Sequence, residues 1–315
     1  MKRNIYSYSK LWMILFVLMG AACTNQVEDA IPESGQPIEF SVQSDWKEIP
    51  NTRLNDVNGT MTFTGGDQIQ IFGFHTSPSG EVKKFMYDGD YPNSGQIVTY
   101  DDKRNSWNYT PKRFWPKEGK LDFYASYPQN SISNNEVNQP MIFDQTVNPF
   151  KRDLLWGVSG KNCATDRNAP VEITMVHALA KVKIIFDESL GDIGQVTVSG
   201  YKAGHFSPMN NDNGVPVWEF DDDKTPIYAD FKYAEIHKNN SVTVTVFILP
   251  DKITGLWMFD TNGNRVYDPY ASDEIQKHTF KAGNAYEVTI SKSKGVRKKN
   301  TNSRSIAMSV RCVSE

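Results

Sequence analysis

The segment Ser241-Val242-Thr243-Val244-Thr245-Val246-Phe247 alternates apolar and polar residues along most of its length. A period of two places the valines on one face and the threonines on the other, which is the pattern of a strand with one buried face. The same alternation recurs at 171–175 and, close to the N-terminus, at 38–43, where Ile38, Phe40 and Val42 are expected to face inward. The chain is therefore predicted to be built from strands.

Short strands recur across the rest of the chain. They are predicted at 68–74, 85–87, 97–100, 107–109, 121–127, 176–186, 195–200, 215–220 and 285–290. Gly, Asn, Asp and Ser separate many of them, and no long stretch has the period of a helix. Evenly spaced short strands with almost no helix are typical of β-sandwiches, and the length allows two domains. We predict an all-β protein with two sandwiches in series.

The first 22 residues have the features of a secretory leader. Cations precede an apolar run over 11–19 that is far shorter than the ~20 residues of a membrane-spanning helix, and small residues end it. Small residues directly before Cys23 resemble the lipobox of bacterial lipoproteins. The resemblance implies cleavage before Cys23 and acylation of its thiol, which would anchor the chain without crossing the membrane. An ordinary signal peptide with an unmodified Cys23 is the alternative.

Charge and cysteine content narrow the function classes. The formal net charge of −3 becomes −6 when the three cations of the leader are removed, which argues against a nucleic-acid partner. With Cys23 acylated, only Cys163 and Cys312 could form a disulfide, and their spacing does not demand one. We expect the fold to be held by its hydrophobic core.

Residue patterns that carry catalysis or bind metal are not found in the sequence. The five histidines are isolated from one another and from paired cysteines, so no metal site and no cofactor are expected. His177 lies in an apolar strand and is predicted to be a packed or hydrogen-bonded core residue. The acidic runs at 210–214 and 221–223 lack the spacing of a calcium loop and are interpreted as solvated turns. We do not expect an enzyme, although a pair of catalytic carboxylates depends on a spatial separation that sequence does not give.

Several segments, in order and spacing, resemble the fimbrillin family of Bacteroidetes, the Mfa-like surface lipoproteins. The segments are Thr52-Arg53, Gly66-Asp67-Gln68-Ile69, Trp115-Pro116, 122–128, Gln145 with 153–155, 177–182 and 280–286. The resemblance extends from about 38 to 291. It implies two tandem transthyretin-like Greek-key β-sandwich domains after a lipoprotein signal peptide.

The resemblance also implies a division of the chain and a cellular setting. The predicted division is 1–22 signal peptide, 23–37 lipidated tether, 38–168 N-terminal sandwich, 169–291 C-terminal sandwich and 292–315 basic linker with a candidate donor strand. The expected role is that of a structural subunit of a fimbria that supports adhesion. Expected partners are other fimbrial subunits and outer-membrane lipid bound through Cys23, with the assembled protein in the fimbrium at the cell surface.

Two sites follow from this resemblance. Trypsin-like cleavage is implied after an arginine at about the position of Arg53, in a polar, turn-like segment of the kind that proteases cut. Such a cut would remove Cys23 together with the strand at 38–42 and expose an apolar groove, a site for strand addition from another chain.

The C-terminal tail offers a strand to fill that groove. Ile306, Met308, Val310 and Cys312 recur at every second residue, so one side of the tail is apolar. Residues 292–305, rich in Lys, Arg, Asn and Ser, are interpreted as a linker between subunits. A disordered tail or a remnant of gene fusion is the alternative.

A rival function belongs to another class. Trp46, Trp107, Trp115, Trp218 and Trp257 would suit a surface glycan-binding lipoprotein that stays monomeric, if their rings were exposed. Large aromatic residues more often fill cores, and we expect most of these to do so.

Overall fold

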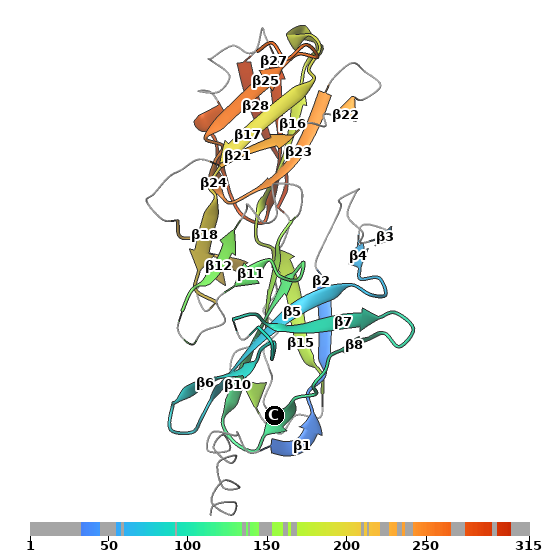
Figure 1. The fold of residues 1–315 in the computed structure, drawn as a ribbon, viewed down its shortest axis with the longest axis vertical. Helices are drawn as coiled ribbons and strands as arrows, with labels where there is room; N and C mark the ends of the chain where they lie inside the picture. Colours follow the sequence, from blue (N-terminus) through green and yellow to red (C-terminus); the bar gives the residue numbers. More distant parts are fainter. Residues whose placement is uncertain are drawn as a thin grey trace, which may run out of the picture.

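In the computed structural model, the β-sheets form two lobes, which lie one above the other in Figure 1. The all-β prediction is confirmed, since strands, turns and loops make up almost all described residues; the 3-10 turn Glu188–Leu190 and the helical residues Ile275 and Gln276 are the exceptions among them. The structure describes residues 33–44, 55–57, 60–91, 93–133, 137, 139–144, 153–159, 163–164, 169–208, 211–212, 214–220, 227–231, 235–236, 242–265, 275–291 and 295–303.

The first lobe is built on one large sheet. Its strands follow the order β2 (Phe40–Ser44), β15 (Val171–His177), β13 (Leu155–Val158), β10 (Lys120–Tyr127), β5 (Gln68–Thr76), β7 (Gln96–Asp101) and β8 (Ser106–Asn108), with β14 (Cys163–Ala164) beside β10 and β6 (Val82–Met86) beside β5. Strand β5 buries side chains on both of its faces, as its apolar sequence predicts. It pairs with β10 from Gln70 to Thr76 and forms the centre of the lobe.

Small sheets flank the large one. They are β1 (Glu33–Pro37) with β9 (Phe114–Pro116), β3 (Asn55–Val57) with β4 (Thr60–Thr62), and β11 (Ile132–Ser133) with β12 (Met141–Asp144) and β18 (Ala203–Phe206). Strand β18 comes from the second half of the sequence but pairs with β12 from the first half. This small sheet therefore joins the two halves of the chain.

The second lobe is a sandwich of two sheets around its own core. The larger sheet has the order β22 (Glu235–Ile236), β23 (Val242–Ile248), β16 (Ala180–Phe186), β27 (Asn284–Ser291) and β28 (Gly295–Ser303), and the smaller has β21 (Ile227–Phe231), β17 (Gln195–Gly200) and β25 (Gly255–Phe259). Two short ladders, β19 (Asn211–Asp212) with β20 (Val215–Pro216) and β24 (Asp251–Lys252) with β26 (Thr279–Phe280), lie outside these sheets. Alternating residues of β16 and β23 meet those of β17 and β25 in one hydrophobic cluster.

The chain passes from the first core to the second at Ala178 and Leu179. The sequence predicts one continuous strand from 176 to 186, but β15 ends at His177 and β16 begins at Ala180 in a different sheet. Ala178 and Leu179 are fully buried in the first core, and the Ala178 amide donates to the Leu154 carbonyl at 2.8 Å. Strands of both sheets need the same alternation of apolar residues. A continuous alternation therefore does not reveal where the chain changes from one sheet to the other.

The two cores also share segments more closely than the predicted domain limits suggest. Strand β15, which begins the predicted second domain, pairs with β13 and β2 of the first lobe. Phe206, Phe247 and Leu249 pack in the first core although they follow the crossing. The limits 38–168 and 169–291 therefore stay a prediction.

Both predicted terminal segments contain strands that the sequence analysis missed. Glu33–Pro37, assigned to the tether, pairs with β9 as β1, and Gly295–Ser303, assigned to the linker, pairs with β27 as β28. Backbone pairing along a sheet edge needs no apolar side chains, so polar composition alone is a poor guide there. The predicted linker is thus corrected to a strand over Gly295–Ser303.

Candidate functional site at the N-terminal strand

Strand β2 lies at the edge of the first sheet and closes its core. Ile38, Phe40 and Val42 are buried, while Glu39 and Gln43 are exposed, as the alternation predicts. Burying three such side chains contributes roughly 4.5 to 9 kcal/mol of gross hydrophobic stabilisation. The short strand therefore fills a substantial part of the core that it covers.

Strand β2 pairs in parallel with β15, whereas the other described ladders of this sheet are antiparallel. Phe40 lies opposite Val171 and Val42 opposite Ile173, and the Val171 amide donates to the Glu39 carbonyl at 2.7 Å. Parallel strands require a crossover connection, here more than 120 residues long. The strand is thus held by long-range contacts and not by a local hairpin.

A buried tyrosine holds the start of this strand. The Tyr109 hydroxyl donates to the Ile38 carbonyl at 2.8 Å, and the Ile38 amide donates to the Arg113 carbonyl at 2.9 Å. Desolvation by burial raises the pKa of Tyr109 to about 12, so the hydroxyl remains a donor at neutral pH. The Phe40 ring packs against Tyr109 at 5.8 Å and edge-on against Phe123 at 5.3 Å between ring centroids.

The outer side of β2 opens onto a groove. Within the described residues, β15 is the one strand that pairs with β2, and β8 ends the same sheet at its other edge. A cavity of about 600 Å³ lies between β2 and β8, lined by residues that include Phe63, Tyr100, Trp107 and Pro170. Edge strands carry unpaired backbone donors and acceptors, which makes such a seam suited to strand pairing.

The residues predicted from sequence to carry the function lie outside the described part of the chain. They are Cys23, Arg53 and the tail residues Ile306, Met308, Val310 and Cys312. The structure does place their neighbours, since β3 begins two residues after Arg53 and β28 ends three residues before Ile306. Sequence analysis missed Tyr109, because its contact with Ile38 spans 71 positions and leaves no local pattern.

His177 is a buried core residue, as predicted. Its Nδ1 lies 2.5 Å from Asp153 Oδ2, and the other oxygen of Asp153 accepts from the Leu154 amide at 2.9 Å. The pair fixes the end of β15 just before the chain crosses between cores. In the part of the chain that the structure describes, no three His, Cys, Asp or Glu residues gather as metal ligands do.

The tryptophans divide by exposure. Trp107 and Trp115 are buried in the first core, Trp218 and Trp257 are half-buried, and Trp46 lies outside the described residues. The described residues contain no helix long and apolar enough to span a membrane.

Comparisons with known proteins place the chain in a family. The model of the fimbrillin-like family matches residues 52–307. No curated protein matches the sequence. Among solved structures, a protein described as a candidate cell adhesion protein from Bacteroides uniformis is 18% identical with a TM-score of 0.47, covering 84% of this chain and 96% of its own.

Two further solved structures are similar to this chain. The fimbrial anchor protein Mfa2 from Porphyromonas gingivalis is 9% identical with a TM-score of 0.41, covering 81% of this chain and 90% of its own. A candidate polysaccharide-binding protein from Bacteroides thetaiotaomicron is 14% identical with a TM-score of 0.44, covering 84% and 99%. Because the family match spans most of the sequence, the chain belongs to the fimbrillin-like family.

Proposed function

We propose that the chain is a structural subunit of a cell-surface fimbria, exported as a lipoprotein, matured by proteolysis and assembled by strand exchange. The observation that carries the proposal is the edge strand β2, whose Phe40 and Val42 are buried in the first core together with the preceding Ile38, yet which has no local partner in sequence. A strand of this kind is removable as one piece. Its removal leaves a defined groove for a strand from another subunit.

Cleavage after Arg53 is the proposed maturation step. A cut at this position separates β1 and β2 from β3 and from the rest of the first lobe. The family match covers residues 52–307, so all but its first two residues belong to the part that would remain. Membrane release follows from the same cut, because the acylated Cys23 would leave with β2.

The proposed replacement strand is the C-terminal tail of a neighbouring subunit. Its residues Ile306, Met308, Val310 and Cys312 would occupy the positions vacated by the apolar side chains of β2. Four inward side chains would contribute roughly 6 to 12 kcal/mol gross, before the cost of ordering the tail. Since β28 ends at Ser303, few residues remain as a spacer, and the neighbour must dock close to the end of β28.

Electron microscopy of producing cells tests the proposal through two variants. Arg53→Ala should leave the protein uncut, membrane-bound and without filaments, and deletion of 305–315 should leave a cut, folded monomer without filaments. Arg104→Ala, a change in an exposed turn of the first lobe, is the matched control and should form normal filaments. Filaments of normal length from both test variants would contradict the proposal.

The rival function, a monomeric glycan-binding lipoprotein, is separated by the same experiment. A monomeric binder keeps β2 in place and forms no filaments in the unmodified strain. The observation that favours this rival function is Trp218, which is only half-buried, so part of its side chain is accessible to a glycan.

A further inference from the structure

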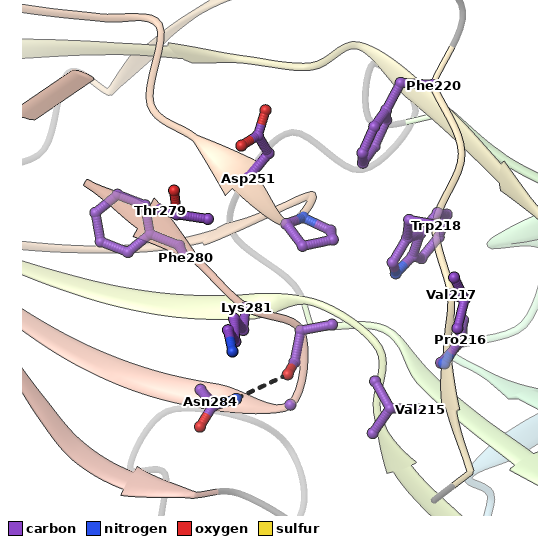
Figure 2. A pocket seen from close by; sticks show the side chains of 13 residues that line it. Val215, Pro216, Val217, Trp218, Phe220, Asp251, Thr279, Phe280, Lys281 and Asn284 are labelled. Carbon is purple, nitrogen blue, oxygen red and sulfur yellow. Dashed lines mark hydrogen bonds between the residues drawn. The ribbon is translucent and has the colours of Figure 1, made fainter. Parts of the chain in front are cut away.

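A groove with one aromatic and one polar wall lies where segments of the two cores meet. Figure 2 shows residues 215–220 on one side and Asp251 with residues 279–284 on the other. Trp218 and Phe220 of the first wall pack against the first core, whereas Phe280 belongs to the second. The cavity measures about 440 Å³, which is within the range of small-molecule sites, roughly 300 to 1,000 Å³.

The aromatic wall is held rigid from behind. The Trp218 indole donates from Nε1 to the Ala178 carbonyl at 2.8 Å, and the Phe206 ring meets it edge-on at 4.8 Å between centroids. The Phe220 ring stacks on Tyr201 at 4.1 Å with the planes 8° apart. Rings fixed before a ligand arrives lose little conformational entropy when it binds.

A glycine allows the indole to lie this close to its support. A Cβ atom on Gly204 would lie 2.9 Å from Cε3 of Trp218, shorter than real side chains tolerate. Glycine at this position of β18 therefore sets the depth at which Trp218 sits in the groove.

The polar wall presents donors and acceptors at fixed places. Asn284 donates from Nδ2 to the Ala282 carbonyl at 3.0 Å, the dashed line in Figure 2, which orients its amide and leaves the amide oxygen able to accept. Lys281 is exposed beside it. The Asp251 carboxylate accepts from the Tyr201 hydroxyl at 3.0 Å.

Asp251 also adopts a strained backbone conformation. Its φ of 107° lies in the region that favours glycine, at a cost of about 1 to 3 kcal/mol for other residues. Strain of this kind is retained where the surroundings impose it, and it concentrates at binding sites.

We propose that this groove binds a pyranose ring of a glycan. A sugar ring offers C–H groups on its face, which pack on aromatic rings, and hydroxyls at its edge, each both donor and acceptor. Both halves of that chemistry are present on facing walls. Lys281 is the one cation in the described lining, which is too little charge for a polyphosphate, and the polar wall does not suit a lipid.

The site is independent of strand exchange. Its lining comes from 215–220, 250–251 and 279–284, and none of these residues belongs to β1, β2 or the C-terminal tail. A chain that polymerises without binding glycans, or binds them without polymerising, would therefore refute one proposal and leave the other standing.

An array of defined oligosaccharides, ending in neutral hexoses, N-acetylhexosamines, sialic acid or uronic acids, tests the inference with the full-length protein in detergent. The best glycan is then titrated by calorimetry against three variants. Asn284→Ala should weaken binding about tenfold, since it removes a hydrogen-bonding group. Lys281→Ala should lower the affinity for acidic sugars about tenfold and the affinity for neutral sugars less.

The third variant is Trp218→Phe, which keeps an aromatic ring but loses the hydrogen bond to the Ala178 carbonyl. It should weaken the binding of every glycan that the unmodified protein binds. Lys103→Ala, in an exposed turn of the first lobe, is the control and should bind as the unmodified protein does. Thermal melting confirms that each variant is folded. The inference is overturned if the folded, unmodified chain retains no glycan, or if folded Asn284→Ala and Lys281→Ala variants retain it as strongly as the control.

Discussion

Strands β2 and β28, which lie near opposite ends of the described chain, each form one edge of a large sheet, but they differ in pairing and in composition. Strand β2 pairs in parallel over five residues, and Phe40 and Val42 on its inner face are buried, as is Ile38 just before it. Strand β28 pairs antiparallel with β27 from Gly295 to Ser303, and its sequence is mostly basic and polar. Strand β2 thus fills a core as well as pairing with its sheet, whereas β28 extends its sheet through a nine-residue strand.

Under the strand-exchange proposal, this difference predicts which of the two edges takes part in exchange. Losing β2 opens a hydrophobic groove, which another apolar strand could refill. Losing β28 would uncover the edge of β27. Lysine-rich edge strands discourage pairing with other chains, so the composition of β28 is that of a protected edge. Exchange is therefore expected at the N-terminal edge and not between β27 and β28.

The largest effect should come from shortening the central anchor of β2. Phe40→Ala should lower the free energy of unfolding of the first lobe by about 3 to 5 kcal/mol, because it removes a buried ring and leaves a cavity. Calorimetry should show the first-lobe transition shifted and the second-lobe transition unmoved. Gln43→Ala, an exposed position on the same strand, is the matched control and should change little. Equal shifts of both transitions would contradict this prediction, because they would mean that the two lobes unfold together.

A smaller effect is expected from the hydroxyl that holds the start of β2. Tyr109→Phe removes the hydrogen bond to Ile38 and leaves a buried carbonyl without that partner, which should cost about 1 to 3 kcal/mol. Urea denaturation followed through tryptophan fluorescence measures this, since Trp107, Trp115 and Trp156 all lie in the first core. An unchanged midpoint would show that the hydroxyl contributes nothing to holding the strand.

Sequence analysis predicted these two edges unequally, for physical reasons. The inward face of β2 follows from a period-two pattern of apolar residues, and Ile38, Phe40 and Val42 are buried as predicted. Strand β28 lacks that pattern, and the crossing at Ala178 and Leu179 is hidden inside an uninterrupted one.

Long-range contacts escaped the sequence analysis for a different reason. The Tyr109 contact with Ile38 and the Trp218 contact with Ala178 join residues 71 and 40 positions apart, and nothing local in the sequence marks either. The same holds for the aromatic groove, whose two walls are separated by about 30 residues in the sequence. Strand patterns thus follow from the sequence, whereas the site does not.

Alkaline pH should weaken the same edge. Burial raises the pKa of Tyr109 from 10 to about 12, so the folded state holds this proton more tightly than the unfolded state. Its contribution is complete below about pH 10 and is lost as the pH rises towards 12. Burial also raises the pKa of Tyr124, which acts in the same direction. Urea midpoints of the first lobe should fall over this range, and they should fall less in Tyr109→Phe; equal slopes would assign the effect to other groups.

The smallest effect on stability is expected at β28. Replacing both Arg297 and Lys299, which lie opposite the half-buried Thr289 and Glu287 of β27, by alanine should change the unfolding free energy of the second lobe by no more than about 1 kcal/mol. It should, however, increase self-association at high concentration, because two edge charges are lost. Light scattering measures this, with Lys103→Ala as control. A variant as monodisperse as the control would show that these two cations do not protect this edge.

Hydrogen exchange at the Val171 amide tests the central claim, that β2 is an exchangeable strand, most directly. This amide donates to the carbonyl of Glu39, the residue before β2, and so reports whether the place of β2 in the sheet is filled. In a chain cut after Arg53 and separated from its N-terminal fragment, exchange at Val171 should accelerate by roughly a hundredfold or more, since the bond is lost. A peptide of residues 304–315 should restore protection, as should the control peptide 38–44, whereas a scrambled peptide should not. Protection at Val171 that survives removal of the fragment, or that only the 38–44 peptide restores, would contradict exchange between β2 and the C-terminal tail.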